Sequence, residues 1–253
     1  MNSTGGRRPY QGVLQILQFN WRFYLLAAVA AAGAILALPF LHTPWRIAAL
    51  IAVMPALFWI ASSLTVSHYI YDCSPLYDLG WIARTLGRTP KRWINIHCGL
   101  DETSELLSAI FPDAERCVVD IYDPQVMTED SIRIAQGRKS GEVPFVSAQY
   151  NALPFDAASI DAVFLIFAAH ELRRHDQRLN LFRELVRILA SGRDLILVEH
   201  SRDIWNFLAF GPGAFHFFSQ KAWRKAASEA GLVLQKEFSM TRFVHVYHLQ
   251  KAA

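Results

Sequence analysis

The sequence predicts an α/β domain with a doubly wound, mostly parallel sheet, preceded by a two-helix transmembrane hairpin. Two observations carry this prediction. Two long uncharged runs lie near the N-terminus, and strand and helix patterns alternate from about residue 90 onward. Composition agrees, because 53% of the 253 residues are hydrophobic and 19% are charged, against about 45–50% and about 25% in typical soluble domains. The chain divides into an N-terminal interfacial segment (1–20), the hairpin (21–71) and a C-terminal domain (72–253).

Charge and cysteine content exclude several classes of protein. The 25 Lys and Arg against 22 Asp and Glu give a net charge of +3, which is too balanced to indicate a nucleic-acid binder. The three cysteines are an odd number without C-x-x-C spacing. Neither a disulfide framework nor a zinc ribbon is therefore expected, and the chain is assigned to a reducing compartment.

Both uncharged runs are long enough to cross a bilayer. Residues 23–41 carry no charged side chain. Residues 47–71 contain one histidine and no Lys, Arg, Asp or Glu. A hydrocarbon core of about 30 Å needs about 20 apolar residues in a helix. A signal peptide has a shorter apolar stretch followed by a cleavage site, whereas here a second run begins after five residues. Two membrane spans are therefore favoured over a signal peptide or a buried hairpin.

The flanking charges set the topology. Arg7, Arg8 and Arg22 precede the first run, four basic residues lie between 84 and 92 after the second, and the connecting loop holds Arg46. The positive-inside rule places both termini and the C-terminal domain in the cytoplasm, with the hairpin in the inner membrane. Aromatic residues near the ends of the runs fit an interfacial belt, and the segment before the first run has the apolar spacing of an interfacial helix. Oligomerisation through the hairpin is compatible with this topology.

The C-terminal domain alternates strands and helices. The residues 161–168 form a continuous apolar run, which is typical of a strand buried on both faces. An uncharged aromatic loop, 204–219, follows the fifth strand and contains one Trp and five Phe. The expected strands are 93–97, 117–121, 143–147, 161–168, 194–199, 233–238 and 244–251, and the expected helices are 102–111, 126–136, 176–189 and 221–230.

The central part of this domain resembles a known family. It reads N-A-L-P-F-D-A-A-S-I-D-A-V-F, then a helix, then G-R-D-L-I-L-V-E-H. This order is similar to that of class I S-adenosylmethionine-dependent methyltransferases, and most similar to the type 11 group, over roughly residues 75–250. The resemblance implies a Rossmann-like fold, S-adenosyl-L-methionine as the cofactor, and methyl transfer to an acceptor.

The resemblance also places the cofactor in the loop after the first strand. The family's loop reads acidic-x-Gly-x-Gly-x-Gly, and its glycines let the backbone approach the cofactor. Here Asn95, His97, Gly99 and Asp101 stand at these four positions, so the acidic residue and two glycines are replaced. Two interpretations stay open. The loop still binds S-adenosylmethionine, or the site has been retuned for another ligand.

Two further loops complete the predicted cofactor site. Asp120, which ends the second strand, keeps the position of the family's ribose-binding carboxylate, because a carboxylate can accept two hydroxyl donors. The alternative role for Asp120 is a cap for the turn that follows. Gln149 stands where the family often has Asp near the adenine, and Asn151 lies two residues later.

Histidines and glutamates follow the fourth and fifth strands. His170, Glu171 and His200 are the predicted catalytic residues, because ligands of open α/β sheets bind at the carboxyl ends of strands. Three roles stay open for this group, which extends to Glu199 and His216: a metal site, a base that deprotonates the acceptor, or hydrogen bonding that positions the cofactor. We assign no metal from the sequence, because none of these residues has i, i+4 spacing on one element.

The leading functional hypothesis combines the membrane hairpin with the resemblance. It is a membrane-anchored methyltransferase whose acceptor is hydrophobic or lipid-like: a quinone, a prenylated compound, a phospholipid or a fatty acid. The aromatic segment 204–219 is expected either to line an acceptor channel open to the bilayer or to form a buried lid. Two alternatives remain: a non-catalytic membrane module that binds a partner, and a retuned enzyme, with or without the help of a metal ion, that acts on a quinone-like lipid without methyl transfer.

Overall fold

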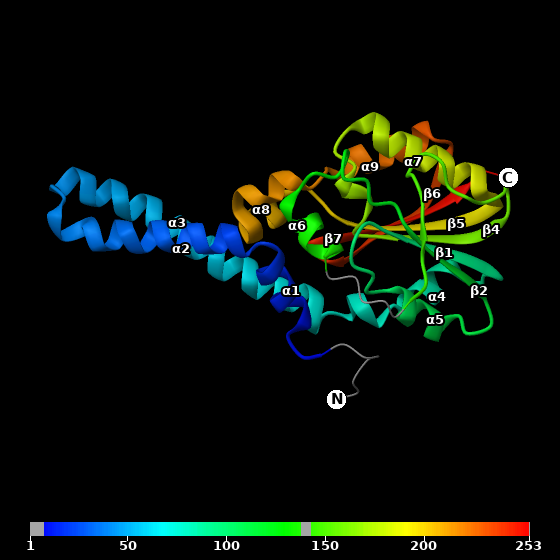
Figure 1. Ribbon diagram of the computed structural model, residues 1–253, viewed down its shortest axis with the longest axis horizontal. Coiled ribbons are helices and arrows are strands. Elements are labelled where there is room, and N and C mark those ends of the chain that lie inside the picture. The colour runs from blue at the N-terminus through cyan, green and yellow to red at the C-terminus, as the bar shows by residue number, and fades with distance from the viewer. Residues whose placement is uncertain (1–7, 138–142, 253) are drawn as a thin grey trace.

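A computed structural model of the chain describes residues 8–137 and 143–252. Residues 1–7 of the predicted interfacial segment, including Arg7, lie outside the described residues. An elongated helical hairpin projects from one end of a globular α/β domain (Figure 1). The division at residues 20/21 and 71/72 stays a prediction.

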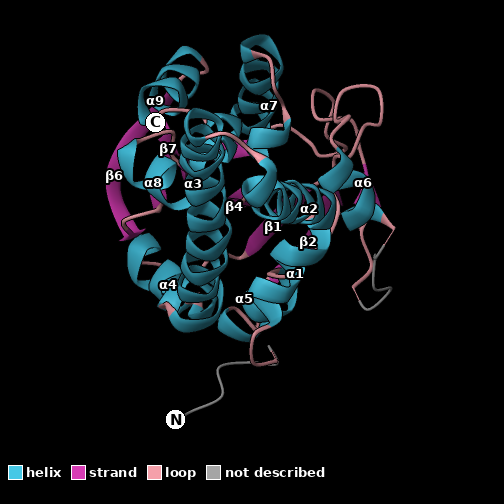
Figure 2. Cartoon of the chain, turned by 90° about the vertical axis from the view of Figure 1, so that its left-hand side faces the viewer, coloured by secondary structure: helices cyan, strands magenta, loops and turns pink. Residues whose placement is uncertain are grey.

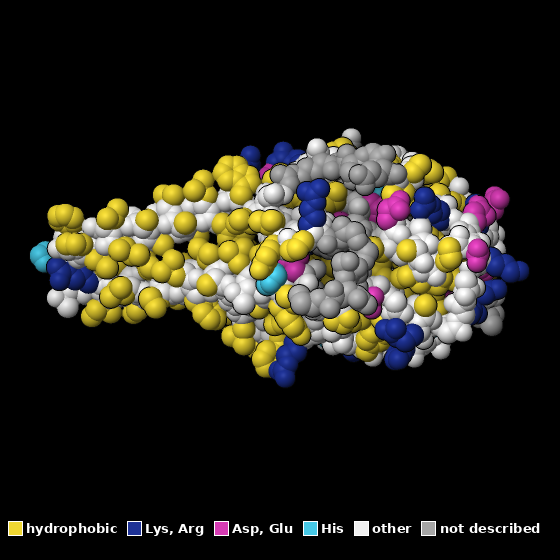
Figure 3. Space-filling view, turned by 90° about the horizontal axis from the view of Figure 1, so that it is seen from below, with side chains coloured by type: hydrophobic (Ala, Val, Ile, Leu, Met, Phe, Trp, Pro, Cys, Tyr) yellow, Lys and Arg dark blue, Asp and Glu magenta, His cyan; other side chains and the backbone are white. Residues whose placement is uncertain are grey.

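The described N-terminal part is mostly helical from Gln11 to His68. The helix α1 (Gln11–Phe19) leads into α2 (Trp21–Ala37), and a short 3-10 turn (Leu38–Phe40) and a tight loop connect α2 to α3 (Thr43–His68). The segments Trp21–Phe40 and Thr43–Asp78 are long and apolar enough to cross a membrane, since 20 helical residues span about 30 Å. Hydrophobic side chains cover the projecting hairpin, whereas acidic side chains gather on the globular part (Figure 3).

Seven strands form the sheet, in the order β3-β2-β1-β4-β5-β7-β6. The first five strands are parallel, and β7 pairs antiparallel with both β5 and β6. The strand order reverses between β1 and β4, which is where open α/β sheets bind ligands. The predicted doubly wound, mostly parallel sheet is confirmed. The strands are β1 (Arg92–His97), β2 (Glu115–Asp120), β3 (Val146–Ser147), β4 (Ile160–Ile166), β5 (Leu189–His200), β6 (Leu232–Thr241) and β7 (Val244–Lys251).

Helices cover both faces of the sheet. The helices α4 (Gly80–Leu86) and α5 (Ser104–Ile110) lie below it in Figure 1, and α7 (His175–Ile188) and α9 (Gln220–Glu229) lie above it. The β4 strand is buried on both sides as predicted, because Val163 and Leu165 join the core under α7 while Phe164 joins the core around α4 and α5. This two-sided burial fixes β4 as the centre of the domain.

Several predicted elements differ from the structure, among them β5, which begins at Leu189 and not at residue 194. The helix expected over 126–136 begins later, as α6 (Asp130–Gln136), and the strand expected over 143–147 is reduced to β3. The prediction of a loop over 204–219 is wrong, because this segment is mostly helical. It forms α8 (Ile204–Phe210) followed by a 3-10 helix (Gly211–His216). The carboxylate of Asp203 accepts a hydrogen bond from the amide of Asn206 and caps α8, which supplies a helix start.

The helix α8 packs against α3 of the hairpin. The ring of Phe207 meets the Trp59 indole edge-on, with centroids 5.7 Å apart, and α8 and α3 lie side by side in the view along the hairpin (Figure 2). Gly211 has a φ of 57°, and a Cβ built on it would lie 2.6 Å from the Trp59 ring. A glycine is therefore required here by both the backbone conformation and the close approach of the indole.

Candidate active site

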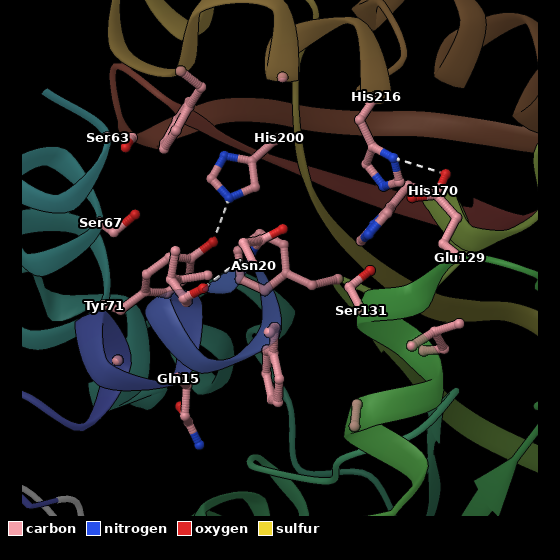
Figure 4. A pocket seen from close by; sticks show the side chains of 18 of the residues that line it. Gln15, Asn20, Ser63, Ser67, Tyr71, Glu129, Ser131, His170, His200 and His216 are labelled. Atoms are coloured by element: carbon pink, nitrogen blue, oxygen red, sulfur yellow. Dashed lines mark hydrogen bonds and ion pairs between the residues drawn. The ribbon is translucent and has the colours of Figure 1, made fainter. Parts of the chain in front are cut away.

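A cavity of about 850 Å³ lies where the base of the hairpin meets the carboxyl ends of β1, β4 and β5. Its domain side is formed by residues of the 96–103 and 166–171 segments, by His200 and by the 210–217 segment. Its hairpin side is formed mainly by apolar and aromatic side chains, including Phe19, Phe23, Trp59 and Ile60. Figure 4 shows polar side chains from α1, α3, α6 and the strand ends facing this shared space. The base of the hairpin therefore forms one wall of the cavity, while the rest of the hairpin projects from the domain.

His200 and Tyr71 join the two halves of the cavity. The imidazole Nδ1 of His200 lies 2.9 Å from the carbonyl of Phe243 and donates to it, so Nε2 accepts the hydroxyl of Tyr71 at 2.7 Å. The ring is 5% exposed and is stacked between Phe167 and Phe217. Burial lowers the pKa of His200 to about 3. His200 is therefore neutral and fixes the position of the Tyr71 hydroxyl (Figure 4).

His170 is held between two carboxylates. Its Nδ1 lies 2.8 Å from Glu199 Oε2, and its Nε2 lies 3.4 Å from Glu171 Oε1. The backbone amide of His170 also donates to Glu199. Burial lowers the pKa of His170, but the two glutamates outweigh it and raise that pKa to about 10. At neutral pH the ring is therefore an imidazolium, which can donate hydrogen bonds but cannot serve as a base.

A third histidine reaches the same place from the 3-10 helix after α8. His216 Nδ1 lies 3.1 Å from Glu129 Oε1, just before α6, and the His216 ring meets the His170 ring edge-on at 5.2 Å (Figure 4). Arg173 Nη1 donates to the backbone carbonyls of both His170 (3.0 Å) and His216 (2.7 Å). This one guanidinium therefore ties together two segments that are distant in the sequence.

The altered loop after β1 is held by its own side chains. Asn95 is 1% exposed and donates to Asp101 Oδ1, Thr103 and Ser104. Asp101 Oδ1 also accepts the amides of Thr103 and Ser104 at the start of α5. Asp101 Oδ2 is buried without a hydrogen-bond partner among the described residues, and Asp101 lines the cavity. The Asp in place of the family's glycine thus brings one buried carboxylate oxygen, without a hydrogen-bond donor among the described residues, to the edge of the cavity.

Gly99 and Asp120 lie beneath α6. Gly99 has a φ of 127°, and a Cβ built on it would meet the side chains of Ile132 at 3.1 Å and Ala135 at 3.2 Å. The helix α6 therefore packs closely on Gly99, where the resemblance places the cofactor. Asp120 is 3% exposed, and it accepts hydrogen bonds from the amide of Tyr122 and from the side chain of Gln136. Asp120 therefore caps the following turn, as the alternative role predicted.

The structure brings together part of the predicted site. His97, Asp101, His170, Glu171 and His200 line this cavity, whereas Asn95, Gly99, Asp120, Gln149 and Asn151 are not part of its lining. Gln149 and Asn151 are exposed and lie in a turn beyond β3. The cofactor and catalytic roles assigned to these residues stay predictions.

Sequence reasoning missed two of the polar groups and the hairpin wall. Tyr71 was assigned to an interfacial aromatic belt, but it points into the cavity from a π-helical turn (Tyr69–Cys73). Glu129 lay inside a predicted helix and instead precedes α6. The available signal was the cluster of Tyr69, Tyr71 and Asp72 at the end of the second uncharged run, since polar groups at that position have a domain to contact.

Comparison with known proteins now identifies the family. Residues 94–197 match the family model described as a methyltransferase domain. This segment is a methyltransferase domain, of the class I S-adenosylmethionine-dependent type. It is 30% identical over 126 residues to a demethylmenaquinone methyltransferase of Thermus thermophilus, covering 48% of this chain and 54% of the relative.

Two further similarities agree with this assignment. The chain is 33% identical over 87 residues to the ubiquinone/menaquinone biosynthesis C-methyltransferase UbiE of Rhizobium etli, covering 30% of this chain and 33% of the relative. It thus spans about half or less of the length of these curated relatives. The crystal structure of a SAM-dependent methyltransferase from Aquifex aeolicus has a TM-score of 0.54 at 16% identity, covering 71% of this chain and 94% of that chain, which shows the shared fold.

Two carboxylates fit the family's cofactor, S-adenosyl-L-methionine, whereas α6 covers Gly99 and would have to shift for a cofactor to approach it. The buried Asp101 Oδ2 has no hydrogen-bond partner among the residues described, and a carboxylate there suits the ammonium group of the cofactor. The Asp120 carboxylate suits a ribose diol, with the Gln136 amide as its present partner at 3.3 Å. A ribose bound to Asp120 would take the place of that amide.

Proposed function

We propose that this protein is a membrane-anchored, S-adenosylmethionine-dependent methyltransferase that acts on a hydrophobic, quinone-like acceptor. The observation that carries the proposal is the cavity whose wall is shared between the strand ends of the methyltransferase fold and the apolar hairpin. An acceptor dissolved in the bilayer can reach such a site along the hairpin. The names of the two curated relatives, both concerned with quinones, support this acceptor class.

The cofactor side of the site uses the loops after β1 and β2. Asp101 would bind the ammonium group, and Asp120 would bind the ribose hydroxyls. When bound, the cofactor supplies an electrophilic methyl group on its sulfonium. The protein's contribution is to align the acceptor atom with that methyl group and to exclude water from the pair.

The acceptor side uses the aromatic wall and the Tyr71–His200 pair. A flat quinol ring suits a cavity bordered by Phe23, Trp59 and Phe217. The Tyr71 hydroxyl, fixed by His200 at 2.7 Å, can accept a hydrogen bond from an acceptor hydroxyl. The His170 imidazolium can donate to an acceptor oxygen and stabilise negative charge that develops on it. In this proposal His170, Glu171 and His200 act by orientation and electrostatics.

The hairpin supports anchorage in the cytoplasmic membrane. Its two apolar segments and the basic residues that flank them favour cytoplasmic termini and a catalytic domain at the inner leaflet. Reporter fusions at either terminus should then both report the cytoplasm. Periplasmic reporter activity at the C-terminus would overturn this topology.

Blocking the hairpin side of the cavity tests the proposal. Ala56 lines the cavity, and Ala52, one turn earlier on α3, is exposed and lies outside its lining. Ala56→Trp should abolish methylation of a quinol in vesicles while S-adenosylmethionine affinity, measured by calorimetry, stays within about threefold, which corresponds to about 0.7 kcal/mol. The matched variant Ala52→Trp should keep both. Unchanged quinol methylation by Ala56→Trp would refute a hairpin-lined acceptor site.

A further inference from the structure

The cavity holds a cluster of two imidazoles and a carboxylate whose ligand atoms converge. One ligand atom from each of His170, Glu171 and His216 lies within 4.8 Å of the other two. All three residues line the cavity. Glu171 is 7% exposed, and its Oε2 atom has no hydrogen-bond partner among the described residues. A buried carboxylate oxygen is costly unless a cation or donor satisfies it.

The surroundings orient both imidazoles toward a common point. Glu199 engages His170 Nδ1 at 2.8 Å, and Glu129 engages His216 Nδ1 at 3.1 Å. Glu129 thus leaves Nε2 of His216 for another partner, and an ion bound by Glu171 would replace the proton that His170 Nε2 directs at Glu171 Oε1, 3.4 Å away. Metal-binding histidines are held in this manner, with a carboxylate or carbonyl on the nitrogen that does not bind the metal. Arg173 adds rigidity by clamping the backbone carbonyls of the two histidines.

We infer that His170, Glu171 and His216 bind a divalent first-row transition-metal ion. Two imidazoles and one carboxylate suit Mn²⁺, Fe²⁺, Co²⁺ or Zn²⁺, whereas Mg²⁺ and Ca²⁺ prefer sites made of oxygen atoms. The three carboxylates of Glu129, Glu171 and Glu199 around two histidines supply the negative charge that such an ion needs. Three protein ligands on one side leave the remaining coordination positions facing the cavity.

The open positions give the ion a role that rests on the proposed function. An oxygen atom of a quinol-like acceptor can occupy such a position, where the ion would act as a Lewis acid and favour the ionised hydroxyl. The ion would thereby hold the acceptor ring at the strand ends, next to the cofactor loop. Metal binding itself requires neither the cofactor nor the acceptor, so it can be tested separately from methyl transfer.

The test counts Mn²⁺ bound to the full chain in detergent after treatment with a chelator, with cofactor and acceptor absent. Loss of the electron paramagnetic resonance signal of free Mn²⁺ measures binding. We expect one ion per chain, which Zn²⁺ displaces because later metals bind such ligands more tightly. Glu171→Gln and His216→Gln should each weaken binding by at least about tenfold, and Glu199→Gln by about 10–100-fold, the range for loss of a carboxylate that orients a ligand.

A matched control uses a histidine–glutamate pair away from the cavity. His175 Nε2 lies 2.6 Å from Glu229 Oε2, and both side chains are about two-fifths exposed (40% and 39%). His175→Gln should leave Mn²⁺ binding unchanged. If Glu171→Gln fails to fold, His216→Gln decides the matter, because its side chain is 26% exposed. Absence of Mn²⁺ binding by the wild type, or equal binding by the wild type and His216→Gln, would overturn the inference and identify the cluster as an ion-pair network.

Failure of this inference is distinct from failure of the proposed function. Methylation of a quinol by metal-free protein that binds no Mn²⁺ would leave the proposed function standing and refute the metal site. Stoichiometric Mn²⁺ binding that depends on Glu171 and His216, in a protein that transfers no methyl group, would confirm the metal site and refute the methyltransferase proposal.

Discussion

Gly211 is a point of contact between the C-terminal domain and the hairpin that leaves no room for an added atom. Its φ of 57° is unfavourable for any residue with a side chain, at a cost of about 1–3 kcal/mol. The new Cβ of Gly211→Ala would also lie 2.6–2.9 Å from three atoms of the Trp59 indole, and such overpacking costs about 1–3 kcal/mol more. We therefore expect Gly211→Ala to lower the free energy of unfolding by about 2–6 kcal/mol.

The assay is thermal unfolding of the full chain in detergent. One kcal/mol corresponds to about 2–4 °C for a chain of this size, so the melting temperature should fall by at least about 4 °C. Gly192→Ala is the matched control, because Gly192 has a φ of 64° but a Cβ there would have no neighbour within 4 Å. It should show the backbone cost alone. Trp59→Leu in the Gly211→Ala background should recover part of the loss.

Two results would refute this reasoning. Equal destabilisation by Gly211→Ala and Gly192→Ala would mean that the indole does not press on this turn. Strict additivity of Trp59→Leu and Gly211→Ala would mean that the two residues do not interact. Either result would show that the contact between Gly211 and Trp59 does not determine how α8 packs against the hairpin.

Three further predictions concern the cavity and the loop after β2. Tyr71→Phe leaves the buried Nε2 of His200 without the hydroxyl that donates to it at 2.7 Å. It should lower the free energy of unfolding, measured by chemical denaturation, by about 1–3 kcal/mol. Tyr69→Phe, at a residue that is 51% exposed, should leave the free energy of unfolding nearly unchanged. The pKa of His170 is about 10 in the folded protein, above the unfolded value of about 6.5. The stabilisation that protonated His170 provides is therefore complete below about pH 6.5 and is lost toward about pH 10. The free energy of unfolding of the metal-free wild type should fall over this range relative to that of His170→Gln. Asp120→Ala should weaken S-adenosylmethionine binding by about 1.5–3 kcal/mol in calorimetry, whereas Gln136→Ala should not weaken it; unchanged affinity in Asp120→Ala would leave Asp120 as a turn cap.

Elements with strong local patterns were predictable from the sequence. The continuous apolar run of β4 and the periodic helix α7 lie within two residues of their expected positions. The start of α6 was not predictable in this way, because Asp123 caps its own turn through the amide of Gln125 and delays the helix to Asp130. The helix α8 was not predicted, because its aromatic and apolar residues are also compatible with a loop. The signal for the helix is Asp203, which caps its N-terminus.

The candidate site was partly predictable, for a physical reason. Strand ends converge in a parallel sheet, so the sequence could place His170 and His200 near one another. Contacts between distant segments, such as His216 with Glu129 and His200 with Tyr71, depend on how the hairpin and the 3-10 helix pack. No spacing along the chain encodes those contacts.

The central claim is methyl transfer from S-adenosylmethionine to a quinone-like acceptor within the shared cavity. The most direct measurement incubates the full chain in vesicles with S-adenosylmethionine labelled in its methyl group and a quinol that lacks one ring methyl group. The label should enter the quinone extracted from the lipid phase, and Ala56→Trp should prevent this transfer while Ala52→Trp should not. Label that never enters the quinone, or that enters it equally in Ala56→Trp, would contradict the account.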